Sequence, residues 1–266
     1  MLRRYSHTIL VGAVLSFGFA LQGCQPKSSN DKDKSQVESS KPQQTEVKSH
    51  FNGLITAKTQ DMTLPSPRAC DETGCTDFQV QRIETNQKWI NDYFIGRIKR
   101  DLPLAFENPS KNPVQENVPE VELSQSSITV RYIGQNDQLA TFVISNSIYT
   151  AGAAHGMYHE EYVNFDLKQK KRIALQDLLV AGAEEQATKA LYDANSMWLD
   201  QHNVALEKLK LSDNFYYGAQ GIVFVYPLYE LASYAEGMTE LVLPYSQVKG
   251  LIQPQYLPNL PHYPSS

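Results

Sequence analysis

The stretch Thr150–Asp166, with the sequence TAGAAHGMYHEEYVNFD, holds the residue types most able to do chemistry. It places His155 and His159 four residues apart and follows them directly with Glu160 and Glu161. Two histidines at this spacing can bind Zn²⁺ together when they share one helix face, as in HExxH enzymes. The stretch therefore raises the hypothesis of a zinc-dependent hydrolase.

The local sequence argues against this metal site. Gly152 and Gly156 bracket His155, which makes a poor helix, and the residues that follow have the pattern of a strand. Side chains four residues apart on a strand share a face but lie roughly 13 Å apart, too far to hold one metal. We therefore interpret this segment as a turn that needs positive φ at a glycine, with the imidazole of His155 hydrogen-bonded to neighbouring backbone. A tight turn at Gly156 would keep the zinc alternative open.

Tyrosine is plentiful, with 15 residues, and many of them come late in the chain. A tyrosine offers amphipathic contact area at low entropic cost, so it is favoured at binding surfaces. A half-buried position in a sheet is the more ordinary role for any one of them. An exposed loop that contacts a partner through Tyr149, Tyr158 and His159 is thus a third interpretation. The candidate partner-binding residues of the whole chain are Tyr149, His155, Tyr158, His159, Glu160, Tyr229 and Tyr234.

Other catalytic patterns are missing from the sequence. There is no G-x-S-x-G elbow, no P-loop, no G-x-G-x-x-G and no Ser-x-x-Lys with its companion motifs. Paired carboxylates occur in any acidic chain and carry no weight without geometry. We therefore predict no catalytic residue, no metal and no cofactor, and expect a protein that is not an enzyme.

The N-terminal residues follow the pattern of a bacterial lipoprotein signal peptide. Arg3 and Arg4 precede an apolar run, Ile9–Ala20, that is too short to span a membrane comfortably. The run leads into LQGC, residues 21–24, which resembles the lipobox where a protease cuts before a lipid-bearing cysteine. We predict a signal peptide over residues 1–23 and a lipid on Cys24, with an uncleaved membrane anchor as the alternative.

Residues 24–50 contain almost no apolar residues and predict a lipidated, disordered tether. The lipid would hold the chain on a membrane surface without spanning it. Gln25 follows the cysteine, whereas an Asp there is the usual inner-membrane retention signal of Gram-negative bacteria. We therefore expect the cell envelope, with attachment to the outer membrane on its periplasmic side.

The net charge narrows the class of partner. The formal net charge is −5, and removal of Arg3 and Arg4 would make it more negative. The lack of a basic patch argues against nucleic acid as a partner, while a cationic protein partner is compatible with this charge.

Export favours oxidation, so Cys70 and Cys75, in CDETGC, predict a disulfide at a hairpin tip. A redox-active pair or a metal site is the sharper alternative, but the spacing and the lack of nearby ligands argue against both.

The folded part divides near the Pro- and Asn-rich stretch Phe106–Glu120. Residues 51–120 read as a small strand–strand–helix unit, with Trp89, Ile90, Tyr93, Phe94 and Ile98 at helical spacing. Residues 121–252 are richer in strands, including a short apolar strand after the polar turn 168–171, and contain helices without regular βαβ alternation. Residues 253–266 form a Pro-rich tail that we expect to lie extended along the surface. The predicted class is α+β, a mainly antiparallel sheet with packed helices.

Two of these segments together resemble a known family. YTAGAAHGM with YVNFDL, and the later GIVFVYPLYELASYAEGMTELVLPYS, are similar to the C-terminal domain of the RsiV-like family, found in a lysozyme-sensing anti-sigma factor and in the peptidoglycan deacetylase PdaC. The family's turn usually reads GGAHG, and Ala153 replaces its second glycine. The later segment matches at Gly221, Phe224, Pro227, Tyr229, Glu230, Tyr234, Gly237, Pro244 and Tyr245.

The resemblance covers about Ser127–Leu251, and the preceding unit is more weakly similar to the domain that usually comes before it. It implies an extracytoplasmic α+β module without a catalytic centre, whose receptor branch binds lysozyme. The cytoplasmic anti-sigma segment and the deacetylase domain of these relatives are not seen in this sequence. We therefore expect a non-enzymatic envelope lipoprotein that binds a protein or peptidoglycan ligand, a lysozyme-like protein among them. The zinc hydrolase is the alternative.

Overall fold

The computed structural model describes residues 53–71, 74–108, 118–119 and 122–259. All of them belong to one structural unit, residues 48–266. The predicted signal peptide, Cys24 and the predicted tether lie outside the described residues. Within the described ranges, no helix is long and apolar enough to cross a membrane.

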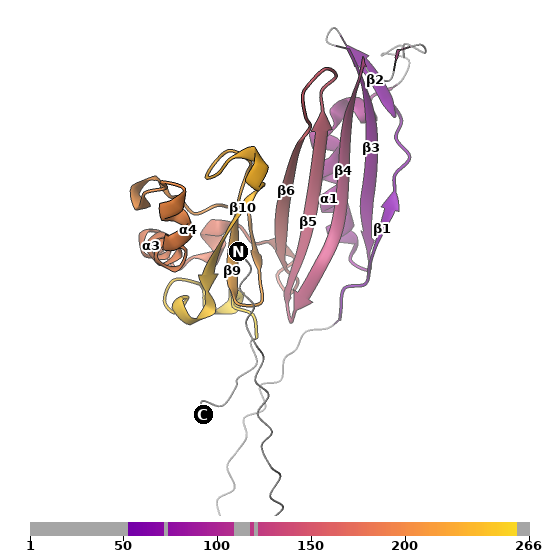
Figure 1. Ribbon diagram of the computed structural model, residues 1–266. Helices are drawn as coiled ribbons and strands as arrows, with labels where there is room; N and C mark the ends of the chain where they lie inside the picture. Colours follow the sequence, from indigo (N-terminus) through magenta and orange to yellow (C-terminus); the bar gives the residue numbers. More distant parts are fainter. Residues whose placement is uncertain (1–52, 72–73, 109–117, 120–121, 260–266) are drawn as a thin grey trace, which may run out of the picture. The chain divides into compact units, whose positions relative to one another are not determined.

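A seven-stranded sheet is built from the first part of the described chain (Figure 1). Its strands lie in the order β1-β3-β4-β5-β6-β7, and β2 also pairs with β3. Neighbouring strands are antiparallel except β3 and β4, which are parallel. The strands are β1 Ala57–Asp61, β2 Arg68–Asp71, β3 Gly74–Thr85, β4 Leu123–Asn136, β5 Leu139–Tyr149, β6 Met157–Asp166 and β7 Lys171–Arg172.

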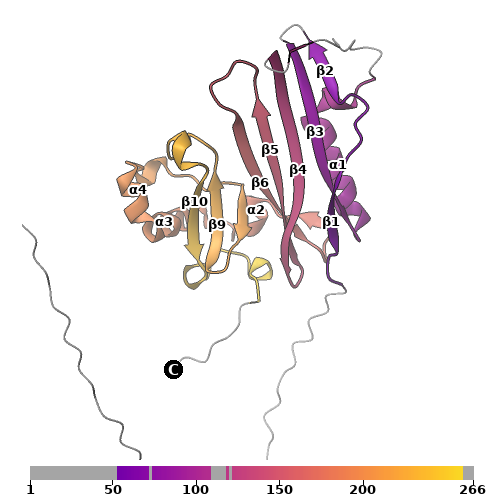
Figure 2. The same ribbon diagram turned by 45° about the vertical axis from the view of Figure 1, so that its right-hand side comes forward.

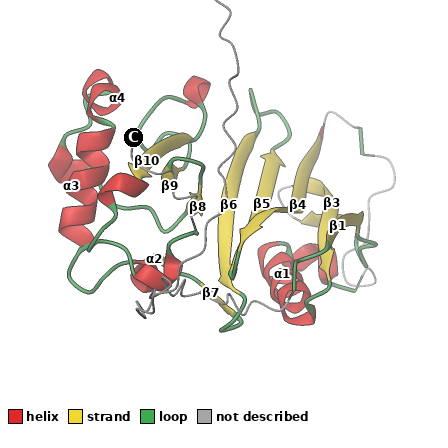
Figure 3. Ribbon diagram, turned by 90° about the horizontal axis from the view of Figure 1, so that it is seen from below, coloured by secondary structure: helices red, strands yellow, loops and turns green. Residues whose placement is uncertain are grey.

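Helix α1, Lys88–Asp101, covers one face of this sheet (Figure 3). Ile90, Phe94 and Ile98 recur at helical spacing, and none is more than 1% exposed. They share a core with alternate strand residues, since a strand turns every second side chain to the same face. The helix predicted from this spacing is confirmed. The strand residues of this core include Phe78, Val80, Ile128, Val130, Phe142 and Ile144.

A three-stranded antiparallel sheet follows, in the order β10-β9-β8. Figure 2 shows α3 and α4 on the side of this sheet away from β6, and α3 packs against β10. Leu191 and Leu199 of these helices are fully buried in a second core. The elements are α2 Leu175–Leu178, α3 Glu184–Ala194, α4 Ser196–Gln201, β8 Phe215–Tyr217, β9 Gly221–Tyr226 and β10 Thr239–Pro244.

Two asparagines join the sheets along β6. The side chain of Asn214 accepts a hydrogen bond from Tyr162 N and donates one to Glu160 O, both at 2.7 Å. It thereby satisfies backbone groups that the edge of β6 would otherwise leave open. The amide of the buried Asn164 donates to Phe215 O at 2.6 Å, which links β6 to β8 directly.

The predicted fold class, α+β with a mainly antiparallel sheet, is confirmed, but two local predictions are wrong. The short apolar strand expected after the turn 168–171 is only β7, and helix α2 follows, since the Asp177 carboxylate accepts the Ala174 N–H at 3.1 Å and closes its first turn. The described part of the tail, residues 253–259, does not simply lie on the surface, because Tyr256 is buried in the second core. It sits in a short 3₁₀ helix, Pro254–Tyr256.

Strands from both sides of the Pro/Asn-rich stretch share one sheet. β3, from the predicted strand–strand–helix unit, pairs in parallel with β4, from the predicted C-terminal domain. A parallel pair needs a crossover between its strands, and α1 lies in that crossover. The division of the chain near residue 120 stays a prediction about sequence modules, and the sheet is continuous across it.

Candidate functional site

The loop between β5 and β6 is a compact turn. Gly152 has φ +79°, a conformation that L side chains rarely adopt, and Ala153 N donates to Thr150 O at 2.9 Å. Nδ1 of His155 lies 3.0 Å from Gly156 O, which is the contact to neighbouring backbone that the sequence predicted. The segment GAAHG therefore closes the β5–β6 hairpin.

The segment 227–238, between β9 and β10, packs on this hairpin. Tyr234 donates its phenol hydrogen to Gly156 O at 2.8 Å, and its ring stacks on His155 with centroids 4.2 Å apart. Met238 Sδ accepts a hydrogen bond from Glu160 N at 3.2 Å. Two stretches far apart in sequence thus form one local structure. They are the two segments that carry the family resemblance.

An exposed apolar patch crosses this junction. Eight large hydrophobic side chains are exposed in the described chain, and four of them, Ile148, Met157, Tyr158 and Tyr229, lie here. A hollow of about 200 Å³ runs between the hairpin and Pro227, and Ile148, Met157 and Tyr158 line part of it. Exposed apolar side chains gathered in one place mark interaction sites more often than scattered ones do. We call this patch the aromatic surface and define it as Ile148, His155, Met157, Tyr158, Tyr229 and Tyr234.

Backbone conformation sets Tyr229 apart within the aromatic surface. Its φ is +68°, in the left-handed region, although its side chain is 56% exposed. Such a conformation costs a non-glycine residue about 1 kcal/mol, and burial of the ring does not offset that cost here. The ring lies 5.7 Å from Tyr234, so the strained turn places it at the end of the aromatic row. A strained residue that exposes its ring is a candidate contact residue.

The chain around this surface is acidic. From Leu211 to Val248 there is no Lys or Arg. Glu236 pairs with His202, 2.5 Å apart, and the Trp198 carbonyl together with Glu236 raises the pKa of that imidazole. Within the described residues, Glu230 and Glu240 form no ion pair. The four acids of this stretch are Asp213, Glu230, Glu236 and Glu240.

The two glutamates that follow His159 are engaged elsewhere. Glu161 forms a bidentate ion pair with Arg97 of α1, with Nη1 and Oε1 2.8 Å apart. Burial raises the pKa of Glu161, but the hydrogen bonds and charge of Arg97 outweigh that effect and hold it below its ordinary value. Glu160 accepts hydrogen bonds from Ser145 at 2.9 Å and Arg131 at 3.3 Å.

The zinc hydrolase is therefore not favoured by the geometry. His155 stacks on Tyr234 in the loop, His159 lies on β6 beside the hollow, and both glutamates are bonded to arginines. Within the described ranges, no three His, Cys, Asp or Glu side chains are grouped so that they could hold a metal ion.

The other candidate residues fall in separate places. Cys70 and Cys75 face each other across the β2–β3 hairpin and are joined, with an S–S distance of 2.04 Å, as predicted. Cys24 lies outside the described residues. Tyr149 is not part of the aromatic surface and lines a polar hollow on the large sheet. Two residues of the aromatic surface, Ile148 and Met157, were missed. They face each other across β5 and β6. An apolar pair at the otherwise polar end of a hairpin is the sequence feature that could have predicted them.

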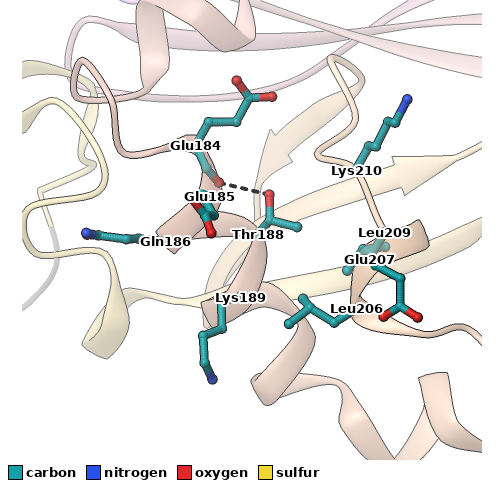
Figure 4. A pocket seen from close by; sticks show the side chains of 9 residues that line it. All are labelled: Glu184, Glu185, Gln186, Thr188, Lys189, Leu206, Glu207, Leu209 and Lys210. Carbon is teal, nitrogen blue, oxygen red and sulfur yellow. Dashed lines mark hydrogen bonds between the residues drawn. The ribbon is translucent and has the colours of Figure 1, made fainter.

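A wider hollow, of about 1010 Å³, lies between α3 and the segment 206–210 (Figure 4). Its charged side chains point in different directions, and one hydrogen bond, from Thr188 Oγ1 to Glu184 O at 2.8 Å, joins two of its residues. Lys189 is paired with Asp193. No set of groups converges on a common point, so this hollow carries no functional assignment.

One family model matches part of this chain. Residues 165–246 match the family model "Protein of unknown function (DUF3298)". The DUF3298 match includes the segment 227–238 and β8 to β10, and it begins after the hairpin tip. No curated protein matches the chain. The resemblance to the RsiV-like family stays a prediction.

A solved structure of a DUF3298 protein supports the fold, and a second such structure is less similar. A DUF3298 family protein from Pseudomonas aeruginosa PAO1 is 20% identical, with a TM-score of 0.61, and the alignment covers 79% of this chain and 100% of that one. A DUF3298 family member from Bacteroides fragilis NCTC 9343 is 17% identical, with a TM-score of 0.49 and coverage of 75% and 93%. At this level of identity, the first comparison establishes a shared fold.

Proposed function

We propose that this protein is a non-enzymatic binding module of the bacterial cell envelope and that its aromatic surface holds a protein ligand of the lysozyme type. The observation that carries the proposal is the aromatic surface itself. Exposed tyrosines and apolar side chains from two distant segments converge there, and Tyr229 keeps its ring exposed at a conformational cost. A few residues carry most of the binding energy in protein interfaces, and tyrosine is enriched among them.

Charge favours a cationic ligand. The stretch Leu211–Val248 is free of Lys and Arg, and Glu230 and Glu240 are uncompensated within the described residues. Opposite charges at the rim of an interface speed association and are screened by salt. A basic muramidase such as hen-type lysozyme has the matching charge, and the RsiV-like resemblance points to the same class of ligand.

The proposed place of action is the cell envelope, with Cys24 as the lipid-bearing residue and the outer membrane as the site of attachment. The motif LQGC and the polar residues that follow it support this location. A ligand that reaches the periplasm would then meet the aromatic surface without a transport step.

Calorimetry of the full-length chain with hen-type lysozyme tests the proposal. We expect binding that weakens as salt is raised, and a Kd about tenfold or more higher for Tyr229→Ala, because truncation removes an exposed aromatic contact. Met197→Ala is the matched control, since Met197 is also an exposed apolar side chain but lies on α4. Absence of binding, or an equal loss in both variants, would refute a lysozyme-type ligand at this surface.

A further inference from the structure

The face of the large sheet opposite α1 carries rows of polar side chains. The strand register aligns Gln79 of β3, Ser127 of β4 and Ser147 of β5 in one row across three strands. The neighbouring row contains Asp77, Gln125 and Tyr149. Because side chains alternate along a strand, these residues project from the face that does not hold the α1 core. Figure 1 views the sheet from this side, with α1 behind the strands.

This face is hollowed where the rows meet. A depression of about 120 Å³ is lined by both rows, and it adjoins a hollow of about 630 Å³ through Gln79 and Ser127. A third hollow, of about 460 Å³, shares Asp77 and Gln79. Gln79 thus lines all three. We call the central depression the polar trough and define it as Asp77, Gln79, Gln125, Ser127, Ser147 and Tyr149.

The polar groups of the trough are not used within the protein. In the described part of the chain, the side chains of Gln79, Gln125, Ser127 and Ser147 form no hydrogen bond. The next row of the same face behaves differently, since Gln81 donates to Asp61 at 2.9 Å and Ser145 to Glu160 at 2.9 Å. The trough therefore offers carboxamides and hydroxyls that can both donate and accept.

The trough is also electrically neutral. Its single carboxylate, Asp77, is held by Arg68 through two hydrogen bonds of 2.5 and 2.8 Å. No Lys lines it, and its other members are uncharged. A phosphate or nucleic-acid ligand would find no free cation, so the matching ligand is neutral and rich in hydrogen-bonding groups.

Geometry distinguishes between a peptide and a sugar chain. The strands β3, β4 and β5 each have a hydrogen-bonded neighbour on both sides, so a peptide cannot add to them as another strand. A ligand on this face can therefore bind only to side chains. The row Gln79–Ser127–Ser147 spans roughly 10 Å, about the length of a disaccharide unit. The ring of Tyr149 closes one end, where it can pack against the apolar face of a pyranose.

We propose that the polar trough binds a neutral glycan chain. Gln79 and Gln125 exchange hydrogen bonds with sugar hydroxyl or acetamido groups. Ser127 and Ser147 form hydrogen bonds with sugar hydroxyl groups, and the ring of Tyr149 stacks on a sugar ring at the end of the trough. The site shares no residue with the aromatic surface and does not depend on a protein ligand. An envelope protein with both sites would hold a glycan and a protein at once.

Calorimetry of the full-length chain with tetra-N-acetylchitotetraose and with cellotetraose tests this proposal. We expect binding of at least one of them, unchanged by salt because the ligand is neutral. The substitution Gln79→Leu keeps the size of the side chain but removes its donor and acceptor, so Kd should rise about tenfold. Gln125→Leu provides a second variant with the same expected direction.

Gln169→Leu is the matched control, because Gln169 is an exposed glutamine in the β6–β7 turn, outside the trough. Tyr229→Ala should leave oligosaccharide binding unchanged, which separates this site from the lysozyme experiment. The proposal is overturned if neither sugar binds, or if Gln79→Leu and Gln125→Leu bind as tightly as Gln169→Leu.

Discussion

Single residues in the segment 227–238 determine whether the aromatic surface can form. Gly237 has φ +81° and ψ −161°, a region of backbone conformation that is essentially restricted to glycine. A Cβ there would also lie 2.9 Å from the phenol oxygen of Tyr158, a member of the aromatic surface. Gly237 thus lets the segment approach β6 while Tyr158 stays in place.

Gly237→Ala should therefore lower the free energy of unfolding by about 1–3 kcal/mol and weaken lysozyme binding, since Tyr158 must move. Gly96→Ala is the contrasting substitution. Gly96 lies inside α1 with open space around its Cα, so alanine there should stabilise the fold by about 1 kcal/mol. Urea denaturation of both variants gives the two free energies. Equal effects of the two substitutions would contradict the role given to Gly237.

Residue type predicts part of the candidate site, but which of its residues lie together depends on how the chain folds. Because tyrosine is typical of binding surfaces, the sequence predicts Tyr158, Tyr229 and Tyr234 as contact residues, and the structure brings Tyr229 and Tyr234 together with His155. The same reasoning predicts Tyr149, which lies in the polar trough instead. No spacing rule joins residue 155 to residue 234, because that contact depends on how two sheets meet.

Among the elements, α1 and β6 are linked by the ion pair Arg97–Glu161. Both side chains are less than one-fifth exposed, so the charges are largely removed from water and depend on each other. Asp101 and Arg172 flank the pair at 3.5 and 4.0 Å. The pair therefore holds the helix against the strand that carries the hairpin tip.

Arg97→Met should destabilise the protein by about 3 kcal/mol at neutral pH, because it leaves the Glu161 carboxylate buried with only Arg172, 4.0 Å away, to compensate its charge. In the native protein the pKa of Glu161 is lowered below its usual value of 4.5, so the stability that the pair contributes is present above that pH and is lost as the pH falls through the lowered value. The deficit of the variant should thus shrink in acid, where Glu161 can take up a proton.

Urea unfolding at pH 7 and near pH 4 measures this change. Lys88→Met is the matched control, since Lys88 forms an exposed pair with Asp92 on the same helix and should contribute about 0.5 kcal/mol. A deficit for Arg97→Met as small as that of Lys88→Met, or one that grows in acid, would show that the pair is not coupled in this way.

Element prediction succeeded where periodicity was long. The buried positions 90, 94 and 98 predict α1, and the alternation over β4 and β5 predicts that hairpin. Helix α2 has only four residues, LQDL, so no helical period can develop, and its mixture of apolar and polar residues does not exclude a strand. Burial of Tyr256 could not be predicted, because the pocket that receives it is built by residues distant in the chain.

For the whole molecule, the aromatic surface and the polar trough lie on different parts of one continuous sheet system. The hairpin end of β5 and β6, together with the segment 227–238, builds the first, and β3, β4 and β5 build the second. The two hydrophobic cores, one under α1 and one around β8 to β10, hold these strands rigidly. A rigid platform with two binding surfaces suits a protein that holds ligands better than one that must close around a substrate.

The proposed attachment to the envelope concerns the whole molecule, and the position of its cysteines allows a specific test. The chain has three cysteines, and two are joined in the β2–β3 hairpin, which leaves Cys24 as the only one outside that bond. In a Gram-negative host fed an alkyne-tagged fatty acid, we expect the full-length protein to carry the label and to fractionate with the outer membrane. Cys24→Ala should lose the label and leave that fraction.

The control is the double substitution Cys70→Ala and Cys75→Ala, which should keep the label because the hairpin disulfide has no part in acylation. Label that persists in Cys24→Ala would refute the lipoprotein assignment.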